Sequence, residues 1–149
     1  AHMPSEYKKA VNSKTDLWNF EANRKADIVV VNLGTNDYVR LHSSGYETDE
    51  QKKEIFGAAA YDFAKQIIEA NGENIKIVFA FGLMTASPNI VDACYKETIS
   101  KLKTTDGFTN AYYCRLPTDR TGGDSHPTVA GDLAAAKVLS EFIKTEVLK

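Results

Sequence analysis

The feature that most constrains this chain is a threefold alternation between strand-like and helix-like patterns. Runs rich in β-branched and aromatic residues predict strands at 27–33, 75–81 and 111–116, and apolar residues at helical spacing follow each run. The first run is continuous rather than alternating, which is typical of a strand buried on both faces. We therefore expect an α/β fold with parallel strands and right-handed crossover helices.

Residues that cap or stop helices set the expected helix boundaries. Thr48 and Gln51 have capping-box spacing at the start of the first helix, and Asn71-Gly72 is a stop signal at its end. Ser87-Pro88 predicts the start of the second helix, and His126-Pro127 predicts the start of the third.

Apolar stripes on the first and third helices predict which helix faces pack against the sheet. In the first helix the stripe consists of Ile55, Phe56, Ala59, Phe63, Ile67 and Ala70. The third helix carries a longer stripe made of Val129, Leu133, Ala136, Leu139, Phe142, Ile143 and Val147. Residues at this spacing lie on one face of a helix, so we expect both stripes to be buried.

Composition indicates one domain and excludes several classes of protein. The chain has 149 residues, of which 43% are hydrophobic, and this is enough for one core. The net charge is −2, so no large basic field is present to hold a nucleic acid, and no apolar run is long enough to span a membrane. The two cysteines, Cys94 and Cys114, are too few for a disulfide framework and form either one bridge or two buried thiols.

Three parallel strands make a small sheet with at least one uncovered apolar edge. Doubly wound domains usually have about five or six strands, and an uncovered edge invites pairing with another strand. Either another segment, another chain, a swapped copy or the first 26 residues must cover this edge. Residues 1–3, Ala-His-Met, resemble a cloning scar and are left out, so the expected domain spans 4–149.

Two polar groups of residues are expected at the carboxyl ends of the strands, where open α/β sheets bind their ligands. The first is Gly34-Thr35-Asn36-Asp37, which is typical of a turn, and the second is Asp124-Ser125-His126-Pro127 after the third strand. Asn36 could donate an amide N–H to a developing oxyanion. The alternative is an Asx-turn in which Asn36 only caps the next segment.

His126 is the candidate general base. Near a helix N-terminus the positive end of the helix dipole favours the neutral imidazole, which is the state that accepts a proton. The alternative is a surface or capping histidine. The neighbouring Ser125 is not expected to be a nucleophile, because no strand precedes it and adjacent side chains diverge at a helix start.

Trp18 is the only tryptophan and lies in a cluster at 17–21 that is expected to form a short helix before the first strand. Its ring could stack on a sugar near the site, because an aromatic face is a large apolar surface. The alternative is packing in the core or at an edge.

Together these residues resemble the conserved blocks of a known family. The strand ending in Gly34-Thr35-Asn36-Asp37 is similar to the third block of the SGNH (GDSL) hydrolases, and Asp124-Ser125-His126-Pro127 is similar to their final block. The stretch 16–21 before a valine-rich strand makes carbohydrate esterase family 2, which includes acetyl xylan esterases, the closer match. The resemblance implies a three-layer α/β/α, flavodoxin-like sheet and a secreted serine esterase that deacetylates plant polysaccharide or oligosaccharide without metal or cofactor.

The resemblance also implies roles for individual residues. Asn36 is an oxyanion-hole donor, Gly34 lets the backbone approach, and Asp37 braces the loop. His126 activates a serine and then protonates the leaving alcohol. Asp124 lies two residues before His126 rather than the usual three, so either Asp124 or a backbone carbonyl orients the imidazole.

The family's nucleophile block, a Gly-Asp-Ser after the first strand, and its glycine block are missing where they should occur. By the resemblance both belong to an upstream part of the protein, so the sheet is incomplete and the chain is expected to be inactive alone. The open edge would then pair with this upstream part, or with a second copy through strand 27–33.

Two other hypotheses stay open. The first is a non-catalytic binding or scaffolding module on the same frame, in which Asn36 and His126 are relics. The second is a flavodoxin-like receiver or nucleotide binder, which the lack of a glycine-rich phosphate loop and of an acidic cluster after the first strand disfavours.

Overall fold

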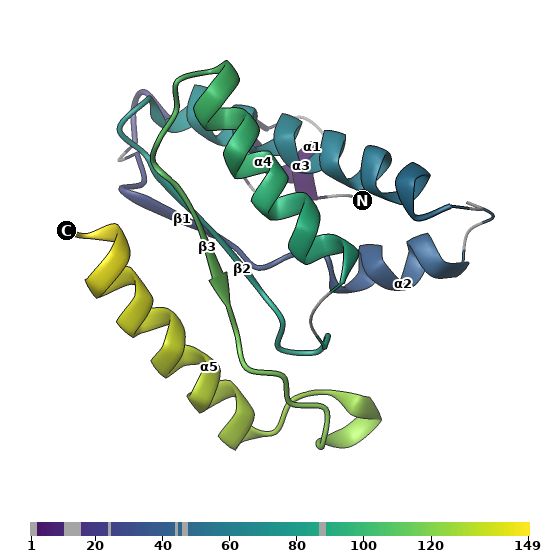
Figure 1. Cartoon of the computed structure of the whole chain (residues 1–149). Helices are drawn as coiled ribbons and strands as arrows, with labels where there is room; N and C mark the ends of the chain where they lie inside the picture. The colour runs from purple at the N-terminus through teal and green to yellow at the C-terminus, as the bar shows by residue number, and fades with distance from the viewer. Residues whose placement is uncertain (1–2, 11–15, 24, 44, 46–47, 87–88) are drawn as a thin grey trace.

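The computed structural model describes residues 3–10, 16–23, 25–43, 45, 48–86 and 89–149. Its sheet consists of β1 (Ile28–Val31), β2 (Lys76–Phe81) and β3 (Ala111–Arg115), as Figure 1 shows. The strand order is β1-β2-β3 and both pairs are parallel, with Ile28 opposite Lys76 and Ile77 opposite Ala111. The expected parallel α/β sheet is therefore confirmed.

Helices lie on both faces of this sheet and give it three layers (Figure 1). One face is covered by α3 (Asp49–Asn71) and α4 (Ile90–Thr105), with the shorter α1 (Met3–Glu6) and α2 (Thr35–Ser43) on the same side. The other face is covered by α5 (Val129–Phe142), which follows the 3-10 turn η1 (Gly123–Ser125) and continues into the π-helical turn η2 (Ile143–Val147). No helix in the described ranges is long and apolar enough to cross a membrane.

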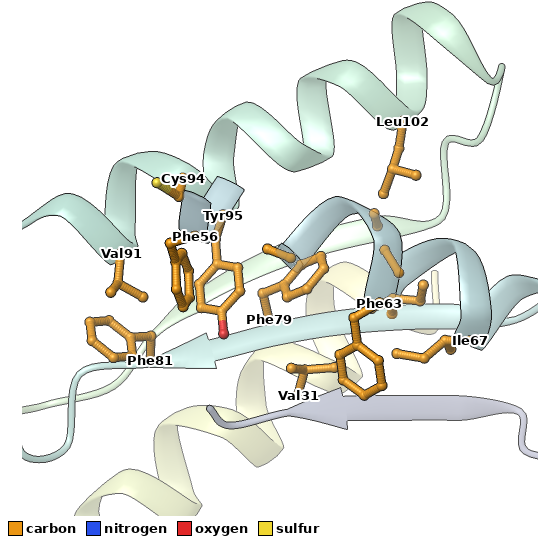
Figure 2. Packing of buried hydrophobic residues seen from close by; sticks show 14 of the residues in the cluster. Val31, Phe56, Phe63, Ile67, Phe79, Phe81, Val91, Cys94, Tyr95 and Leu102 are labelled. Atoms are coloured by element: carbon orange, nitrogen blue, oxygen red, sulfur yellow. The ribbon is translucent and has the colours of Figure 1, made fainter. Parts of the chain in front are cut away.

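The larger core lies between the sheet and the layer of α3 and α4. Every residue from Ile77 to Phe81 in the central strand is fully buried. Phe79 and Phe81 point toward the helices, where the ring of Tyr95 stacks on Phe79 with centroids 4.7 Å apart (Figure 2). The central strand is therefore buried on both faces, as parallel strands between two helical layers usually are.

The two cysteines are free and lie in different cores. Cys94 on α4 belongs to the core beneath α3 and α4 (Figure 2), whereas Cys114 on β3 packs with Val78 and Ala80 beneath α5. Of the two predicted states, one bridge or two thiols, the structure has two thiols. Burial raises the pKa of Cys94 to about 11, so this thiol stays protonated near neutral pH.

The first long helix, α3, begins and ends at the predicted signals. Thr48 and Gln51 form the expected capping box, and Gly72 follows the last helical residue with a φ of 93°. The predicted stripe is buried at Phe56, Phe63, Ile67 and Ala70, but Ile55 and Ala59 are exposed. The buried stripe is therefore narrower than the prediction, with Ala60 in the place expected for Ala59.

The starts of the next two helices differ from the prediction. Asn89 caps α4, and the predicted signal at 87–88 lies outside the described residues. The last helix begins at Val129 rather than at His126, because the Thr128 hydroxyl accepts a hydrogen bond of 3.1 Å from the Gly131 N–H and so caps the helix.

Two expectations about short helices are wrong. The segment 17–21 is not helical, because the Asn19 side-chain oxygen accepts hydrogen bonds from the N–H groups of Glu21 (3.0 Å) and Ala22 (2.8 Å) and holds a turn. Conversely, the Gly-Thr-Asn-Asp group is not only a turn, since α2 begins at Thr35. Burial of Leu41 in the larger core anchors this helix.

Neither outer strand of the sheet, β1 or β3, has a described strand on its outer side, and one face of α5 is not covered by described residues. No described strand pairs with the outer edge of β1, and the N-terminal segment pairs with itself through a bridge between Lys9 and Leu17. In β1, Val30 is 40% exposed, whereas Val129 and Leu133 on α5 are 77% and 67% exposed. The first strand is therefore not buried on both faces, and the prediction that the whole α5 stripe is buried is wrong.

Candidate functional site

Asn36 and His126 lie at the same edge of the sheet. The chain leaves the carboxyl end of β1 at Asn32 and reaches Asn36 in the first turn of α2, and it leaves β3 at Leu116 and reaches His126 before α5. Because the strands are parallel, these ends meet at one edge. Only β2 lies between them, so β1 and β3 are separated by roughly 10 Å, twice the usual strand spacing. Both side chains are exposed to solvent.

Gly34 makes the sharp turn between β1 and α2. Its φ is 103°, a left-handed conformation that favours glycine, and a Cβ there would lie 2.8 Å from Cγ1 of Val91. Its carbonyl accepts a hydrogen bond of 2.8 Å from the N–H of Tyr38, and the hydroxyl of Tyr95 donates to the Leu33 carbonyl at 3.2 Å. The turn is therefore held on both sides of Gly34, and it fixes where α2 begins.

The side chain of Asn36 makes no hydrogen bond to any described residue. An Asx-turn, which would use its oxygen, is therefore not formed within the described part of the chain. The amide N–H₂ group remains available to a ligand at the sheet edge. Next to it, Asp37 stands in the first turn of α2, where a negative charge is favoured by the helix dipole.

A cavity of about 250 Å³ lies beside Asn36, between β1, α1 and the layer of α3. Asn36, Asp37 and Arg40 contribute the polar part of its lining. The rest is mostly apolar and includes Val31, Leu33, Phe56, Phe63, Phe79 and Tyr95. Burial, with a smaller effect from the Asp37 charge, raises the pKa of Tyr95, so its phenol stays protonated.

The imidazole of His126 is oriented by a backbone carbonyl. Its Nδ1 lies 3.1 Å from the carbonyl oxygen of Asp124. A carbonyl oxygen only accepts hydrogen bonds, so in the neutral ring Nδ1 carries the proton and Nε2 keeps its lone pair. The carboxylate of Asp124 forms no hydrogen bond within the described ranges. Of the two alternatives for orienting the ring, the structure therefore has the backbone carbonyl.

The turn before His126 is strained. Asp124 and Ser125 have φ values of 53° and 59°, and consecutive left-handed residues other than glycine cost about 1–2 kcal/mol each. Two backbone hydrogen bonds close the turn, from the His126 N–H to Gly123 (3.0 Å) and from the Gly122 N–H to His126 (2.9 Å). This conformation aims the Asp124 carbonyl at the ring and leaves the Ser125 side chain exposed.

Trp18 is not brought to this edge. Its backbone N–H donates a hydrogen bond of 2.9 Å to the carbonyl of Lys8, and the Lys8 ammonium pairs with Glu69 at 2.6 Å. Glu69 stands in the last turn of α3, which leads into the amino end of β2. The structure therefore places Trp18 toward the amino ends of the strands, opposite Asn36 and His126.

A partly buried ion pair supports the middle of this edge and was not predicted from the sequence. Arg115, the last residue of β3, pairs with the buried carboxylate of Asp92 at 3.0 Å and donates to the carbonyl of Thr85. Tyr113 also donates to Asp92, and burial together with this acid raises the pKa of Tyr113 to about 12. Asp92 stands at the third position of α4, where an acidic residue is common in a helix cap. The sequence around Asp92 therefore does not indicate an ion pair with Arg115.

Asp119 is a second residue that the sequence analysis missed. Its carboxylate accepts hydrogen bonds from both the N–H and the hydroxyl of Thr121 and Thr128, at 2.6–2.9 Å. The spacing Asp-x-Thr is a weak sign of such an Asx-turn. Among the described residues, no group of three or more histidines, cysteines or acids could hold a metal ion.

Solved structures match the fold of this chain, whereas no protein-family model and no curated protein matches it. The acetyl xylan esterase Est2A from the rumen bacterium Butyrivibrio proteoclasticus superposes with a TM-score of 0.81 at 21% identity, over 96% of this chain and 45% of that one. A carbohydrate esterase whose active site is described as displaying divergent catalytic and non-catalytic binding functions gives 0.73 at 20%, over 95% and 45%. A family two carbohydrate esterase from Clostridium thermocellum, in complex with cellohexaose, gives 0.68 at 23%, over 93% and 42%.

These matches establish the fold. The chain spans less than half the length of the three structures, and nearly all of it superposes on that part. This chain thus shares its α/β fold, with three parallel strands, with a portion of each of these three structures.

Proposed function

We propose that residues 4–149 are the C-terminal part of the catalytic domain of a serine carbohydrate esterase of family 2. The observation that carries this proposal is the orientation of His126, whose Nδ1 donates to the Asp124 carbonyl and leaves Nε2 to accept a proton. Asn36 offers an unengaged side-chain amide at the same edge of the sheet. The fold shared with parts of three carbohydrate esterases supports the same assignment.

The reaction is a transfer of an acyl group to a serine and then to water. Nε2 of His126 takes the proton of the serine hydroxyl as the serine oxygen attacks the ester carbon. The Asn36 amide donates a hydrogen bond to the oxyanion that forms on the carbonyl oxygen. The imidazolium then gives its proton to the departing sugar oxygen, and water, activated by the same imidazole, releases acetate and the serine.

The serine and the remaining oxyanion donors come from a part of the protein upstream of this chain. The surface that this part would cover is the open edge of β1 together with the exposed face of α5, where Val30, Val129 and Leu133 stand in solvent. A helix that is apolar on two faces is usually buried on both. Completion of the sheet at β1 would bring a new strand end next to Asn36.

The proposed substrate is an acetylated polysaccharide or oligosaccharide. The whole enzyme would work outside the cell, because such polymers do not enter it. The proposed chemistry requires neither a metal ion nor a cofactor.

The test compares the isolated chain with the full-length protein on p-nitrophenyl acetate and on acetylated xylan. The chain alone should not exceed the rate in buffer. In the full-length protein, Asn36→Ala should lower kcat by about 10²–10³-fold, the usual effect of removing one oxyanion donor. His126→Ala should lower it by about 10³-fold or more, because the proton acceptor is lost.

His42 provides the matched control. It is exposed on α2, and its Nδ1 also lies against a backbone carbonyl, that of Tyr38 at 2.8 Å. His42→Ala should therefore leave the esterase activity unchanged. Turnover by the isolated chain that disappears in His126→Ala would contradict the proposal, since it would require a nucleophile within this chain.

The second candidate is a module that binds polysaccharide without cleaving it. It is favoured by the match to an esterase with both catalytic and non-catalytic binding functions, because the same fold then serves binding as well. Retardation of the full-length protein in gels containing xylan or soluble cellulose, without release of acetate from acetylated xylan, would favour the module. Release of acetate that depends on His126 would favour the enzyme.

A further inference from the structure

One carboxylate closes the loop that carries His126. Oδ1 of Asp119 accepts hydrogen bonds from the N–H and the hydroxyl of Thr121, at 2.9 and 2.6 Å. Oδ2 accepts from the N–H and the hydroxyl of Thr128, also at 2.9 and 2.6 Å. Both oxygens are therefore used, and Asp119 joins the two ends of the segment 119–128. Hydrogen bonds from Thr121 and Thr128 hold the pKa of this carboxyl well below its usual range.

The closed loop is attached to the sheet at one end and to α5 at the other. The N–H of Asp119 donates to the carbonyl of Leu83, just after β2, at 2.8 Å. At the other end, the Thr128 hydroxyl accepts from the N–H of Gly131 and caps α5. Asp119 thus ties the segment 119–128 to the end of β2 on one side and to the start of α5 on the other.

The neck of the loop, where Asp119 joins Thr121 and Thr128, is closely packed, as two glycines show. A Cβ at Gly131 would overlap the carboxylate of Asp119, and a Cβ at Gly122 would lie 2.8 Å from the carbonyl oxygen of His126. Gly122 also donates its N–H to that carbonyl at 2.9 Å. The four hydrogen bonds of the Asp119 carboxylate, here called the Asp119 clamp, hold Thr121 and Thr128. Gly122 directly follows Thr121 and contacts the backbone carbonyl of His126, so the clamp is connected to the His126 backbone through one residue.

We propose that Asp119 is the positioning residue of the site, because its clamp holds the strained turn in which the Asp124 carbonyl meets the imidazole of His126. Asp119 is not seen to touch the ring; it acts through the backbone of the loop. The two left-handed residues, Asp124 and Ser125, would relax if the neck opened, and the carbonyl would turn away from Nδ1. The catalytic meaning of this clamp rests on the proposed function, but its structural effect can be measured in the isolated chain.

The experiment records ¹⁵N NMR spectra of the histidine rings in the isolated chain, at a pH high enough for the rings to be neutral. In the wild type, the Nδ1–H form of His126 should dominate, because the Asp124 carbonyl accepts that proton. In Asp119→Ala the ring should lose most of this preference and shift toward the Nε2–H form. Thr121→Val removes one hydroxyl donor and leaves the helix cap of Thr128 intact, so it should cause a smaller shift in the same direction.

His42 serves as the internal reference, since its own carbonyl contact on α2 is remote in sequence from the loop. Its ring signals should stay the same in every variant. If Asp119→Ala does not fold, as judged by its amide spectrum, the Thr121→Val result decides. Unchanged His126 ring signals in a folded variant would overturn the proposal.

A second measurement in the full-length enzyme separates positioning from substrate binding. Asp119→Ala should lower kcat by about 10²-fold, the effect of a misplacement near 1 Å, with little change in KM. If the full-length protein is not an esterase, the NMR result still tests the clamp, so failure of the proposed function and failure of this inference are distinguishable. A rise in KM at unchanged kcat would contradict a positioning role.

Discussion

At the scale of single residues, backbone conformation decides which side chains reach the sheet edge. Gly34 turns the chain from β1 into α2, and Asp124 and Ser125 turn a carbonyl toward His126. In both turns the backbone adopts left-handed φ values, once with glycine and once without it. The first turn is therefore relaxed, whereas the second stores strain at the candidate site.

Gly34→Ala should lower the free energy of unfolding by about 2–5 kcal/mol, because it adds a left-handed alanine and a Cβ at 2.8 Å from Val91. Gly72→Ala is the matched control, since Gly72 has a φ of 93° but nothing within 4 Å of the added Cβ. It should cost only about 1–3 kcal/mol. Urea unfolding of both variants measures the difference, and equal losses would show that the contact with Val91 is unimportant.

The sequence was informative about Asn36 and His126 and carried only a weak sign of the role of Asp119. Asn36 and His126 each follow a strand, so the topology of a parallel sheet alone predicts that they share an edge. The partners of Asp119 lie two and nine residues away in a polar loop, and no periodicity marks them. Trp18 was misplaced for a similar reason, because its position depends on contacts of Lys8 that local patterns do not contain.

At the scale of elements, α5 and α2 show where the sequence pattern and the structure differ. The stripe of α5 was correctly identified as apolar, but its residues divide between a buried face and an exposed one. A helical period shows that apolar residues share a face and not what covers that face. The helix α2 was missed because Thr35, Asn36 and Asp37 are common in turns, whereas burial of Leu41 decides for a helix.

Paired substitutions in α4 and α5 test this division. Leu102→Ala should cost about 2–5 kcal/mol of unfolding free energy, because Leu102 is fully buried. Leu133→Ala should change it by less than about 0.5 kcal/mol in the isolated chain, because Leu133 is 67% exposed. In the full-length protein the second substitution should become costly, and chemical denaturation of both forms checks this. An equally small effect in both would mean that the α5 face stays uncovered.

At the scale of the whole molecule, the open edge of β1 is the dominant feature. The alternation of strands and helices predicted three parallel strands, the family resemblance implied three layers, and the structure confirms both. The sequence pattern could not predict whether the first 26 residues cover the edge of β1, because that depends on tertiary contacts. The described part of that segment forms a strand bridge only within itself, between Lys9 and Leu17, so the outer backbone groups of β1 remain available to another strand.

The isolated chain should therefore associate with itself through β1 as its concentration rises. Val30→Lys places a charge on the exposed side of this edge and should keep the chain monomeric. Val39→Lys, at a residue 60% exposed on α2, should leave association as it is in the wild type. Light scattering over a wide concentration range measures all three, and a wild type that stays monomeric throughout would refute the expectation.

The placement of the two cysteines has a consequence for the chemistry of the surroundings. Cys94 and Cys114 belong to cores on opposite faces of the sheet, so the sheet itself separates their sulfur atoms. Neither thiol has access to an external disulfide, and the fold contains no covalent link that a reductant could cut. The redox potential of the medium is therefore irrelevant to this fold, which is equally compatible with glutathione-rich and with oxidising solutions.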